Sequence, residues 1–309
     1  MEASLVGSEM CIRDRIEGGG LGKFDPKEIG PSDIQKNNGV IDCVAENEKE
    51  ATIIAKKILS YFQGDIKDWK ADDQTQLSNI MPKDRRWSYP VRDIIKIISD
   101  IEEFTEIKPE YGKGIVTCFI RIEGKPFGLL ANDSQHLGGA IDSEGADKAS
   151  SFIEMCSEYG LPIISLVDTP GFMVGPDSEK EGAVRRMSNL FKIGSKVKVP
   201  LTAIFLRKGY GLGAQAMVGG SLHEPVYTAA WPTGEFGAMG LEGAVKLGFK
   251  KELEKIEDNS KREELFNSLV EKLYDKGKAI EAAAHLEIDA VINPSETRSV
   301  ILKSQKAFV

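Results

Sequence analysis

The chain has 309 residues, of which 48 are acidic and 40 are basic, so its net charge is −8. This balance argues against non-specific binding to nucleic acid or to an anionic membrane surface, because clustered Lys and Arg hold a phosphate lattice. No apolar stretch reaches the roughly 20 residues of a membrane span and no signal-peptide core occurs, so we expect no membrane insertion and a cytoplasmic location, or the mitochondrial matrix in a eukaryote.

The first part of the chain carries few fold signals. Residues 1–15 show no hydrophobic period and are expected to be a leader that is not native to the fold, while domain-like sequence begins abruptly at Ile16. Residues 45–62 carry apolar side chains at helical spacing, which predicts one amphipathic helix. Residues 63–86 are polar and turn-prone, which predicts a connection between domains.

Short apolar runs then alternate with helical patterns, which indicates an α/β domain. In chain order the sequence predicts a β-hairpin of residues 115–122 and 127–131, a helix over 147–159, and strands buried on both faces over 162–167 and 201–206.

An apolar stripe follows at helical spacing near the C-terminus. Its members are Leu265, Phe266, Leu269, Val270 and Leu273. The stripe predicts a helix that packs on the core, rather than a groove for a partner.

The four cysteines lie far apart in the sequence. They are Cys11, Cys43, Cys118 and Cys156. Because no CxxC pair occurs, neither a zinc site nor a disulfide scaffold is expected, and the thiols are predicted to be buried and reduced.

Residues 166–171 read LVDTPG, a strand that runs into the DxxG pattern of a GTPase switch. That interpretation needs a phosphate loop, but residues 18–23 read GGGLGK, one residue short of the required spacing, and Phe24 replaces the magnesium-binding hydroxyl. No NKxD tetrad that would bind guanine occurs. The sequence therefore disfavours a nucleotide hydrolase.

Residues 209–214 read GYGLGA, which matches the dinucleotide fingerprint GxGxxA. Arg207 and Lys208 separate the motif from the predicted strand, and the acidic candidate Glu235 lies beyond Pro232 in a predicted turn, so a nicotinamide enzyme is disfavoured. The same glycines at a helix start could leave N–H groups unpaired and form an oxyanion hole. A tight turn that permits close packing is the alternative, and for an isolated turn it is the preferred one.

His136 stands in a Gly-containing loop, where it could act as a general base. No other histidine lies in a motif and no Ser or Cys occupies a nucleophile elbow, so a structural hydrogen-bonding role is favoured. An enzyme built on these residues would depend on backbone oxyanion holes and on a cofactor.

Six segments occur in one order along the chain. They are residues 138–142 with 147–148, 167–172, 206–213, 230–234, 239–240 and 288–298. From about residue 67 to residue 309, this set resembles the C-terminal domain of the carboxyltransferase β subunits of biotin-dependent acyl-CoA carboxylases, which act on acetyl-, propionyl- or methylcrotonyl-CoA. An ordered set of motifs is more specific than one turn, so the resemblance favours the oxyanion hole over the tight turn.

The resemblance implies an α/β fold of the crotonase-like (ClpP/crotonase) class, a spiral of ββα units. It also implies transfer of a carboxylate from carboxybiotin to the α-carbon of an acyl-CoA, with biotin as the cofactor that supplies the base and no metal in this domain. By motif position, the amides of Leu212 and Gly213 form the oxyanion hole for the ureido oxygen of biotin.

Further residues are implied to line the same cleft. They are Gly138, Gly139, Asp168, Thr169, Pro170, Gly171, Phe172, Gly211 and Gln215. Met173 is expected to be a wall of the cleft, and Tyr210 and Trp231 are expected to be packing residues. Gln215 stands where some members carry an acidic residue associated with acyl-chain choice, so the acyl-CoA stays open.

The resemblance also divides the chain. Residues 16–66 resemble the last part of the family's N-terminal domain with its linker, and residues 67–309 resemble its C-terminal domain. In the family the N-terminal domain binds CoA and supplies a second oxyanion hole, and the site lies where that domain of one subunit meets the C-terminal domain of another. We therefore expect a fragment that is poorly active alone.

The expected partners are an acyl-CoA, a biotin carboxylase, a biotin carboxyl carrier domain and further copies of the chain, joined by contacts between N-terminal and C-terminal domains. Two alternatives stay open. The chain could be the carboxyltransferase subunit of a biotin-dependent acyl-CoA decarboxylase, which works in the reverse direction, or a non-catalytic subunit that completes an oligomer.

Overall fold

A single β-sheet forms the centre of the computed structural model, which describes residues 9–306. Its order is β1-β2-β3-β4-β5-β6-β8, and β7 pairs with the far end of β5. The strands are β1 Phe104–Ile107, β2 Ile115–Ile122, β3 Lys125–Asn132, β4 Ile163–Thr169, β5 Leu201–Tyr210, β6 Tyr227–Ala230, β7 Glu235–Gly237 and β8 Ala290–Val291. The predicted α/β class is confirmed.

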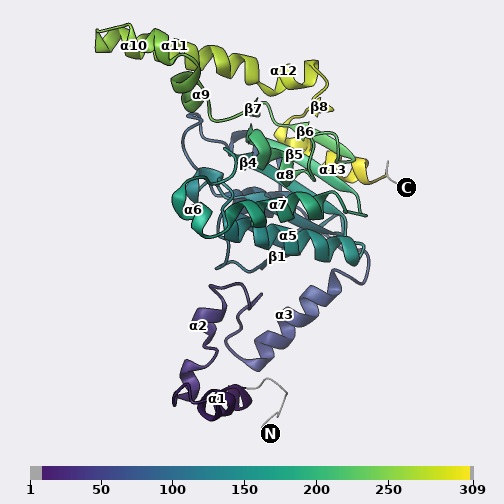
Figure 1. Cartoon of the computed structure of the whole chain (residues 1–309). Helices are drawn as coiled ribbons and strands as arrows, with labels where there is room; N and C mark the ends of the chain where they lie inside the picture. The colour runs from purple at the N-terminus through teal and green to yellow at the C-terminus, as the bar shows by residue number, and fades with distance from the viewer. Residues whose placement is uncertain (1–8, 307–309) are drawn as a thin grey trace.

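Helices surround this sheet and extend beyond it (Figure 1). The α-helices are α1 Glu9–Gly18, α2 Ser32–Gln35, α3 Glu48–Ser60, α4 Val91–Ile98, α5 Ser143–Glu158, α6 Pro176–Lys180, α7 Ala183–Gly194, α8 Gly211–Met217, α9 Leu241–Gly248, α10 Lys250–Glu254, α11 Asn259–Gly277, α12 Ala279–Ala284 and α13 Thr297–Lys306. The 3-10 turns are η1 Pro26–Glu28, η2 Gln74–Asn79, η3 Leu137–Gly139 and η4 Pro294–Glu296. No helix in the described range is long and apolar enough to cross a membrane.

The predicted hairpin is confirmed as the antiparallel pair β2 and β3. Its turn is only two residues long, because Glu123 and Gly124 both adopt positive φ, at 52° and 77°. That pairing of positive φ angles is the turn that suits the twist of a hairpin. From β3 onward, β4, β5, β6 and β8 add in parallel, so their carboxyl ends share one edge of the sheet.

Two apolar layers cover the sheet, one on each face. One layer includes residues of α5, α7 and α8, and the other includes residues of α4, η2 and α13. Because both faces are covered, β2 and β4 are buried along their whole length. The predicted strands at 162–167 and 201–206 are confirmed as β4 and β5, and the predicted helix at 147–159 is α5, which begins earlier because Asp142 caps it.

β5 continues past its predicted end and reaches Tyr210. The expectation that Arg207 and Lys208 separate the glycine motif from the strand is therefore wrong. Glu235, expected in a turn, instead begins β7 and pairs in register with Lys208. β5 can carry two charged residues because a carboxylate on the neighbouring strand satisfies them, as described below.

The N-terminal helices α1, α2 and α3 lie together beyond one edge of the sheet (Figure 1). α3 confirms the amphipathic helix predicted over 45–62, and Asn47 caps it by accepting a hydrogen bond from Glu50 N at 3.0 Å. Of the expected leader, residues 9–15 belong to α1, and residues 1–8 lie outside the described residues.

The helices α9, α10 and α11 project from the opposite end of the molecule (Figure 1). None of the residues of α11 is buried, so the expectation that the stripe of Leu265 to Leu273 packs on the core is wrong. The stripe lies partly covered beside two short helices, for example where Lys246 of α9 stands over the ring of Phe266. Helical spacing marks one apolar face of a helix but not what covers that face.

The described cysteines match their prediction in part. Cys118 and Cys156 are buried, Cys43 is half-buried, and all of them are free thiols. Burial raises the pKa of both the Cys118 and the Cys156 thiol well above its ordinary value.

Candidate active site

Three turns meet at the carboxyl edge of the parallel strands. The first follows β3 at η3, the second follows β4 at 170–171, and the third joins β5 to α8. Ile141 N donates to the Gly171 carbonyl at 3.0 Å, and Met173 N donates to the Ile141 carbonyl at 2.8 Å, which join the first two turns. Ligands of open α/β sheets bind at this kind of edge.

Glycines let these turns approach one another more closely than any side chain would allow. A Cβ on Gly139 would lie 2.2 Å from the Asp168 carbonyl oxygen, and φ at Gly139 is +90°. A Cβ on Gly213 would lie 2.7 Å from the backbone of Gly171. The structure therefore brings together Gly139, Asp168, Gly171 and Gly213, four of the residues that the resemblance implied.

Most amides of these turns already have partners. Gly139 N donates to the His136 carbonyl at 2.9 Å, and Gly171 N donates to Thr169 Oγ1 at 3.1 Å. At α8, by contrast, the N-cap residue Tyr210 makes no side-chain capping bond. The first N–H groups of a helix have no partner inside the helix, so the start of α8 offers the free donors.

The two residues implied to form the hole differ in their surroundings. The side chain of Leu212 is 63% exposed, whereas Gly213 is buried against Gly171. Leu212 thus stands at the mouth of the site and Gly213 at its wall.

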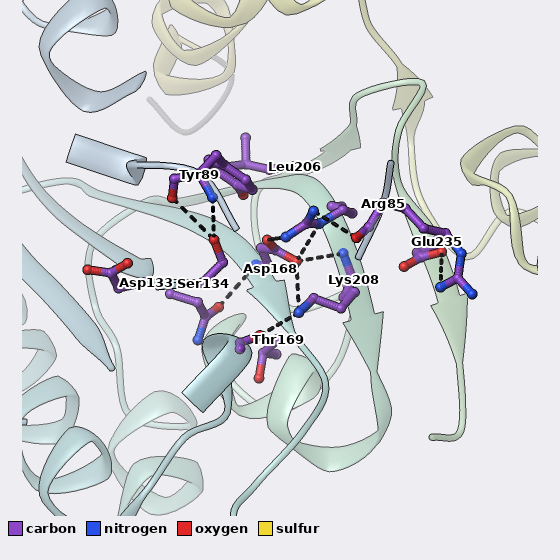
Figure 2. A network of polar contacts seen from close by, with 12 residues as sticks. Arg85, Tyr89, Asp133, Ser134, Asp168, Thr169, Leu206, Lys208 and Glu235 are labelled. Atoms are coloured by element: carbon purple, nitrogen blue, oxygen red, sulfur yellow. Dashed lines mark hydrogen bonds and ion pairs between the residues drawn. The ribbon is translucent and has the colours of Figure 1, made fainter. Parts of the chain in front are cut away.

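A buried charge cluster lies directly behind the turns (Figure 2). The Asp168 side chain has no exposed surface, and its Oδ2 accepts a hydrogen bond from Arg207 Nη2 at 2.9 Å. Its Oδ1 accepts from the backbone N of Lys208 at 3.0 Å and lies 3.8 Å from Lys208 Nζ. The carboxylate of Asp168 therefore faces inward, and only its backbone reaches the turns.

Arg207 joins this cluster to the segment before α4. Its Nη1 donates to the carbonyls of Arg85 and Trp87 at 2.8 and 2.7 Å, and its guanidinium stands 4.9 Å from the centre of the Tyr89 ring. Arg207 is thus satisfied on every side although it is almost fully buried.

The Lys208 side chain points away from Arg207, toward the turn at η3. Its Nζ donates to the Gly138 carbonyl, so one side chain links Asp168 to η3. Burial lowers the pKa of Lys208, and the nearby positive charge of Arg207 and Arg85 adds to that effect, while Asp168 and Glu235 oppose it.

Glu235 is the second buried carboxylate near this edge. It lies 3.5 Å from Arg85 Nη1, and neither of its oxygens has a hydrogen-bond partner in the described part of the chain. Burial raises the pKa of Glu235 above its usual value. The Tyr210 hydroxyl also has no partner at standard hydrogen-bond geometry, but it faces Glu235, and burial together with that carboxylate raises the pKa of Tyr210.

Apolar groups form the rim of the site. Phe172 and Met173 are half-buried, and Phe172 packs on Phe191 with 6.2 Å between ring centres. Leu137 and Val174 are exposed beside the two turns. Trp231 is fully buried and donates from Nε1 to Thr297 Oγ1 at 2.9 Å, consistent with a packing residue.

Gln215 does not join the other residues. Together with Gly211 it lines a cavity of about 410 Å³, on whose far side lie Glu281, His285 and Glu287. The remaining implied residues do not line this cavity.

His136 lies at the turn but makes only a loose contact, with its Nε2 3.6 Å from Asp142 Oδ2. Within residues 9–306, no group of His, Cys, Asp and Glu side chains is arranged to hold a metal ion. The residues that sequence analysis missed are Arg207 and Lys208. Their signal was present, as two cations at the end of an apolar strand with an aspartate at the end of the preceding one.

Comparisons with known proteins show which family the chain belongs to. The profile of the carboxyl transferase domain matches residues 25–309. A solved structure of a single-chain, multi-domain long-chain acyl-CoA carboxylase is 49% identical with a TM-score of 0.88, over 94% of this chain and 28% of its own.

Two curated relatives are similar over much of the chain. The methylmalonyl-CoA carboxyltransferase 12S subunit of Propionibacterium freudenreichii subsp. shermanii is 33% identical over 88% of this chain and 53% of its own length. The methylmalonyl-CoA decarboxylase subunit alpha of Veillonella parvula is 30% identical over 86% of this chain and 52% of its own. The chain thus spans about half the length of the curated relatives it matches.

The structural likeness confirms the expected crotonase-like α/β fold. The family profile covers nearly the whole chain, from the loop before η1 to the last residue. This chain therefore belongs to the carboxyl transferase domain family.

Proposed function

We propose that this chain performs the carboxyltransferase half-reaction of a biotin-dependent acyl-CoA carboxylase, which moves a carboxylate from carboxybiotin to the α-carbon of an acyl-CoA. The observation that carries the proposal is the meeting of the glycine turns beside the uncapped start of α8, in a chain of this family. Such a site offers backbone N–H donors to a negative charge that develops during the reaction.

The residues present fit biotin in their chemistry. The ureido oxygen needs N–H donors, and the start of α8 has them, whereas Gly139 N and Gly171 N are already engaged. The sulfur-containing ring of biotin is largely apolar, and Leu137, Val174 and Leu212 give the mouth an apolar rim.

In this proposal the amides of Leu212 and Gly213 donate to the ureido oxygen and stabilise negative charge that develops there. When bound, carboxybiotin supplies the carboxyl group and, after its release, the base that takes the α-proton of the acyl-CoA. Gly138, Gly139 and the backbone of 168–171 shape the cleft, and Phe172 closes its side and limits access of water.

Gly211 and Gln215 are proposed to serve the same reaction from the other side of α8. Their cavity of about 410 Å³ lies within the size range of small-molecule sites. We propose that Gln215 contacts the part of a ligand that enters this cavity.

The proposed partners are an acyl-CoA, a biotin carboxylase, a biotin carboxyl carrier domain and further copies of the chain. The exposed apolar residues Leu137, Val174 and Leu212 at the mouth support contact with another domain or subunit. We propose that residues 67–309 form the C-terminal carboxyltransferase domain, that residues 16–66 belong with the domain before it, and that the enzyme is cytoplasmic.

Reconstitution tests this function. The chain, combined with an N-terminal carboxyltransferase domain of the family, a biotin carboxylase and biotinylated carrier, should fix labelled bicarbonate into an acid-stable acyl-CoA product in a reaction that needs ATP. The acyl-CoA panel should run from short to long chains, since the relatives act on methylmalonyl-CoA or are described as long-chain enzymes. A complete assembly that labels no acyl-CoA would contradict the proposal.

A second candidate is the reverse reaction in a decarboxylase, which the similarity to the Veillonella parvula subunit favours. In that case the assembly should transfer the carboxyl group of a carboxyacyl-CoA to biotin without ATP. It should not fix bicarbonate into an acyl-CoA.

A further inference from the structure

We propose that Lys208 is a positioning residue, which fixes the Gly138–Gly139 peptide in one orientation against the start of α8. Its role in catalysis rests on the proposed function, but its role in holding the turn does not. The inference comes from the contacts of three groups: the Lys208 ammonium, the Asp168 carboxylate and the Gly138 carbonyl.

Lys208 holds Asp168 and the turn at the same time. Its backbone N donates to Asp168 Oδ1 at 3.0 Å, its Nζ lies 3.8 Å from the same oxygen, and that Nζ also donates to the Gly138 carbonyl. The Lys208 side chain is only 17% exposed, so water competes little for these contacts. A rigid strand thus reaches a loop 70 residues earlier in the chain.

The Gly138–Gly139 peptide is held at both of its polar atoms. The Gly138 carbonyl accepts from Lys208, and Gly139 N donates to the His136 carbonyl at 2.9 Å. Because a peptide unit is planar, these two bonds together fix its rotation about the chain.

Without such a hold, this peptide would be free to rotate. It joins two glycines with positive φ, of +64° and +90°, and glycine adopts either sign of φ with similar ease. Rotation would withdraw Gly139 N from His136 and turn the carbonyl away from Lys208. Lys208 therefore selects one of two orientations that the glycines themselves permit.

The placement of Gly139 explains why this orientation matters. A Cβ there would lie 2.2 Å from the Asp168 carbonyl, and Asp168 is followed by the turn whose Gly171 packs on Gly213 of α8. A shift of the first turn is therefore passed through backbone contacts to the donors proposed for the ureido oxygen.

The test compares Lys208→Met and Lys208→Arg with Lys148→Met. Lys148 is a matched control, since it is also buried and also donates to a backbone carbonyl, but to that of Tyr111 at 2.9 Å and not to one of the three turns. Hydrogen exchange of the Gly139 amide in the full chain should rise about tenfold or more in Lys208→Met, because one bond to a charged donor is lost. It should stay near the wild-type rate in Lys208→Arg and Lys148→Met.

Transfer kinetics in the assembled enzyme give the second measurement. We expect kcat to fall about tenfold in Lys208→Met with little change in KM for the acyl-CoA, and the arginine variant to recover most of the loss. The pH profile adds a readout, because the charges facing Lys208 are Asp168, Arg207, Glu235 and Arg85 and only Lys208 changes between the variants. Arginine stays protonated, so any loss of kcat at alkaline pH that Lys208 causes should be absent in Lys208→Arg.

Unchanged exchange of the Gly139 amide in a folded Lys208→Met would overturn the proposed hold on the turn, and faster exchange with an unchanged kcat would overturn the proposed role in catalysis. If this variant does not fold, Lys208→Gln replaces it, with the same expected exchange. Should no variant and no wild-type assembly transfer a carboxylate, the proposed function fails, and the exchange rates alone decide whether Lys208 holds the turn.

Discussion

Two buried aspartates lie at opposite edges of the sheet. They make similar contacts but hold different parts of the fold. Asp168 is the last residue but one of β4, at the carboxyl edge, and Asp100 lies beside the hairpin turn at the other edge. Both side chains are almost fully buried, both pair with an arginine, and both accept a backbone N–H.

The contacts differ in what they hold. Asp100 accepts from the N–H groups of Glu123 and Gly124 at 3.0 and 2.7 Å and pairs with Arg298 of α13, so it fastens the hairpin to the last helix. Asp168 and its partners instead hold turns that border the proposed cleft. Burial and ion pairing of a carboxylate therefore do not by themselves mark a functional site. The loops that the carboxylate holds decide whether it serves one.

Replacement of Asp100 should have the largest effect on stability. In Asp100→Ala the buried Arg298 guanidinium loses its carboxylate, and two turn amides lose their acceptor, which should cost about 3–5 kcal/mol in free energy of unfolding. Urea unfolding measures this loss. Because the contacts lie far from the carboxyl edge, the folded fraction should transfer carboxylate at the wild-type rate. A folded Asp100→Ala that had lost transfer would break the distinction between the two ends.

The cleft end should show the opposite pattern, with a large loss of activity and a small loss of stability. Leu212→Pro removes one of the two proposed donor N–H groups, and proline is tolerated in the first turn of a helix. Loss of such a donor should lower kcat about 100-fold to 1,000-fold.

Leu212→Ala is the control, because it removes the exposed side chain and keeps the N–H. It should retain kcat within a few-fold, and thermal unfolding should show that both variants fold. Equal activity of Leu212→Pro and Leu212→Ala would mean that this amide does not stabilise the transition state.

Lys148 differs from both aspartates, since it is a buried ionisable group that forms no ion pair within residues 9–306. It donates to the Tyr111 carbonyl at 2.9 Å, and burial lowers its pKa to about 8. The unfolded chain therefore binds the proton between pH 8 and about 10.5 while the folded chain does not, so stability from this group should rise with pH across that window. The gain should be on the order of 3 kcal/mol.

Urea unfolding at several pH values between 7.5 and 10.5 checks the sign. Other lysines and tyrosines titrate in the same range, so the informative quantity is the difference between the wild type and Lys148→Met. The rise assigned to Lys148 should be missing in the variant, and an identical pH dependence in both proteins would refute it.

Local sequence patterns were sufficient for much of this fold. The hairpin, α3 and the two buried strands follow from apolar spacing and turn residues, because those signals depend on neighbours in the chain. Two predictions failed for different reasons. β5 extends over Arg207 and Lys208 because Asp168 of the neighbouring strand meets their charges, a contact between residues about 40 positions apart. The stripe of α11 is only partly covered because the short helices α9 and α10, not the sheet, lie beside it.

The candidate site was also predictable from the sequence only in part. Its glycines could be identified through ordered motifs, but the engagement of Gly139 N with His136 depends on exact loop geometry that no spacing reveals. The family resemblance placed Gln215 with the other cleft residues by its motif position, two residues after Gly213. Two positions along α8 turn a side chain by roughly 200° about the helix axis, so Gln215 shares with Gly211 a face that lines a separate cavity.

The smallest predicted effect concerns a single neutral hydroxyl at each of two places. Thr169 Oγ1 accepts from Gly171 N at 3.1 Å in a cleft turn, and Thr117 Oγ1 donates to the Ile107 carbonyl at 2.9 Å away from the cleft. Both residues are fully buried. Thr117→Val loses one neutral hydrogen bond and should lower the free energy of unfolding by about 1 kcal/mol. Thr169→Val loses the two contacts of its hydroxyl with Gly171 N and O and should lower it by about 1–2 kcal/mol. Only Thr169→Val should also lower kcat, by a few-fold, because Gly171 packs on Gly213. Thr169→Ser keeps the hydroxyl and should restore the rate, and an equal effect of both valine variants on kcat would show that the loss reflects stability rather than the position of the turn.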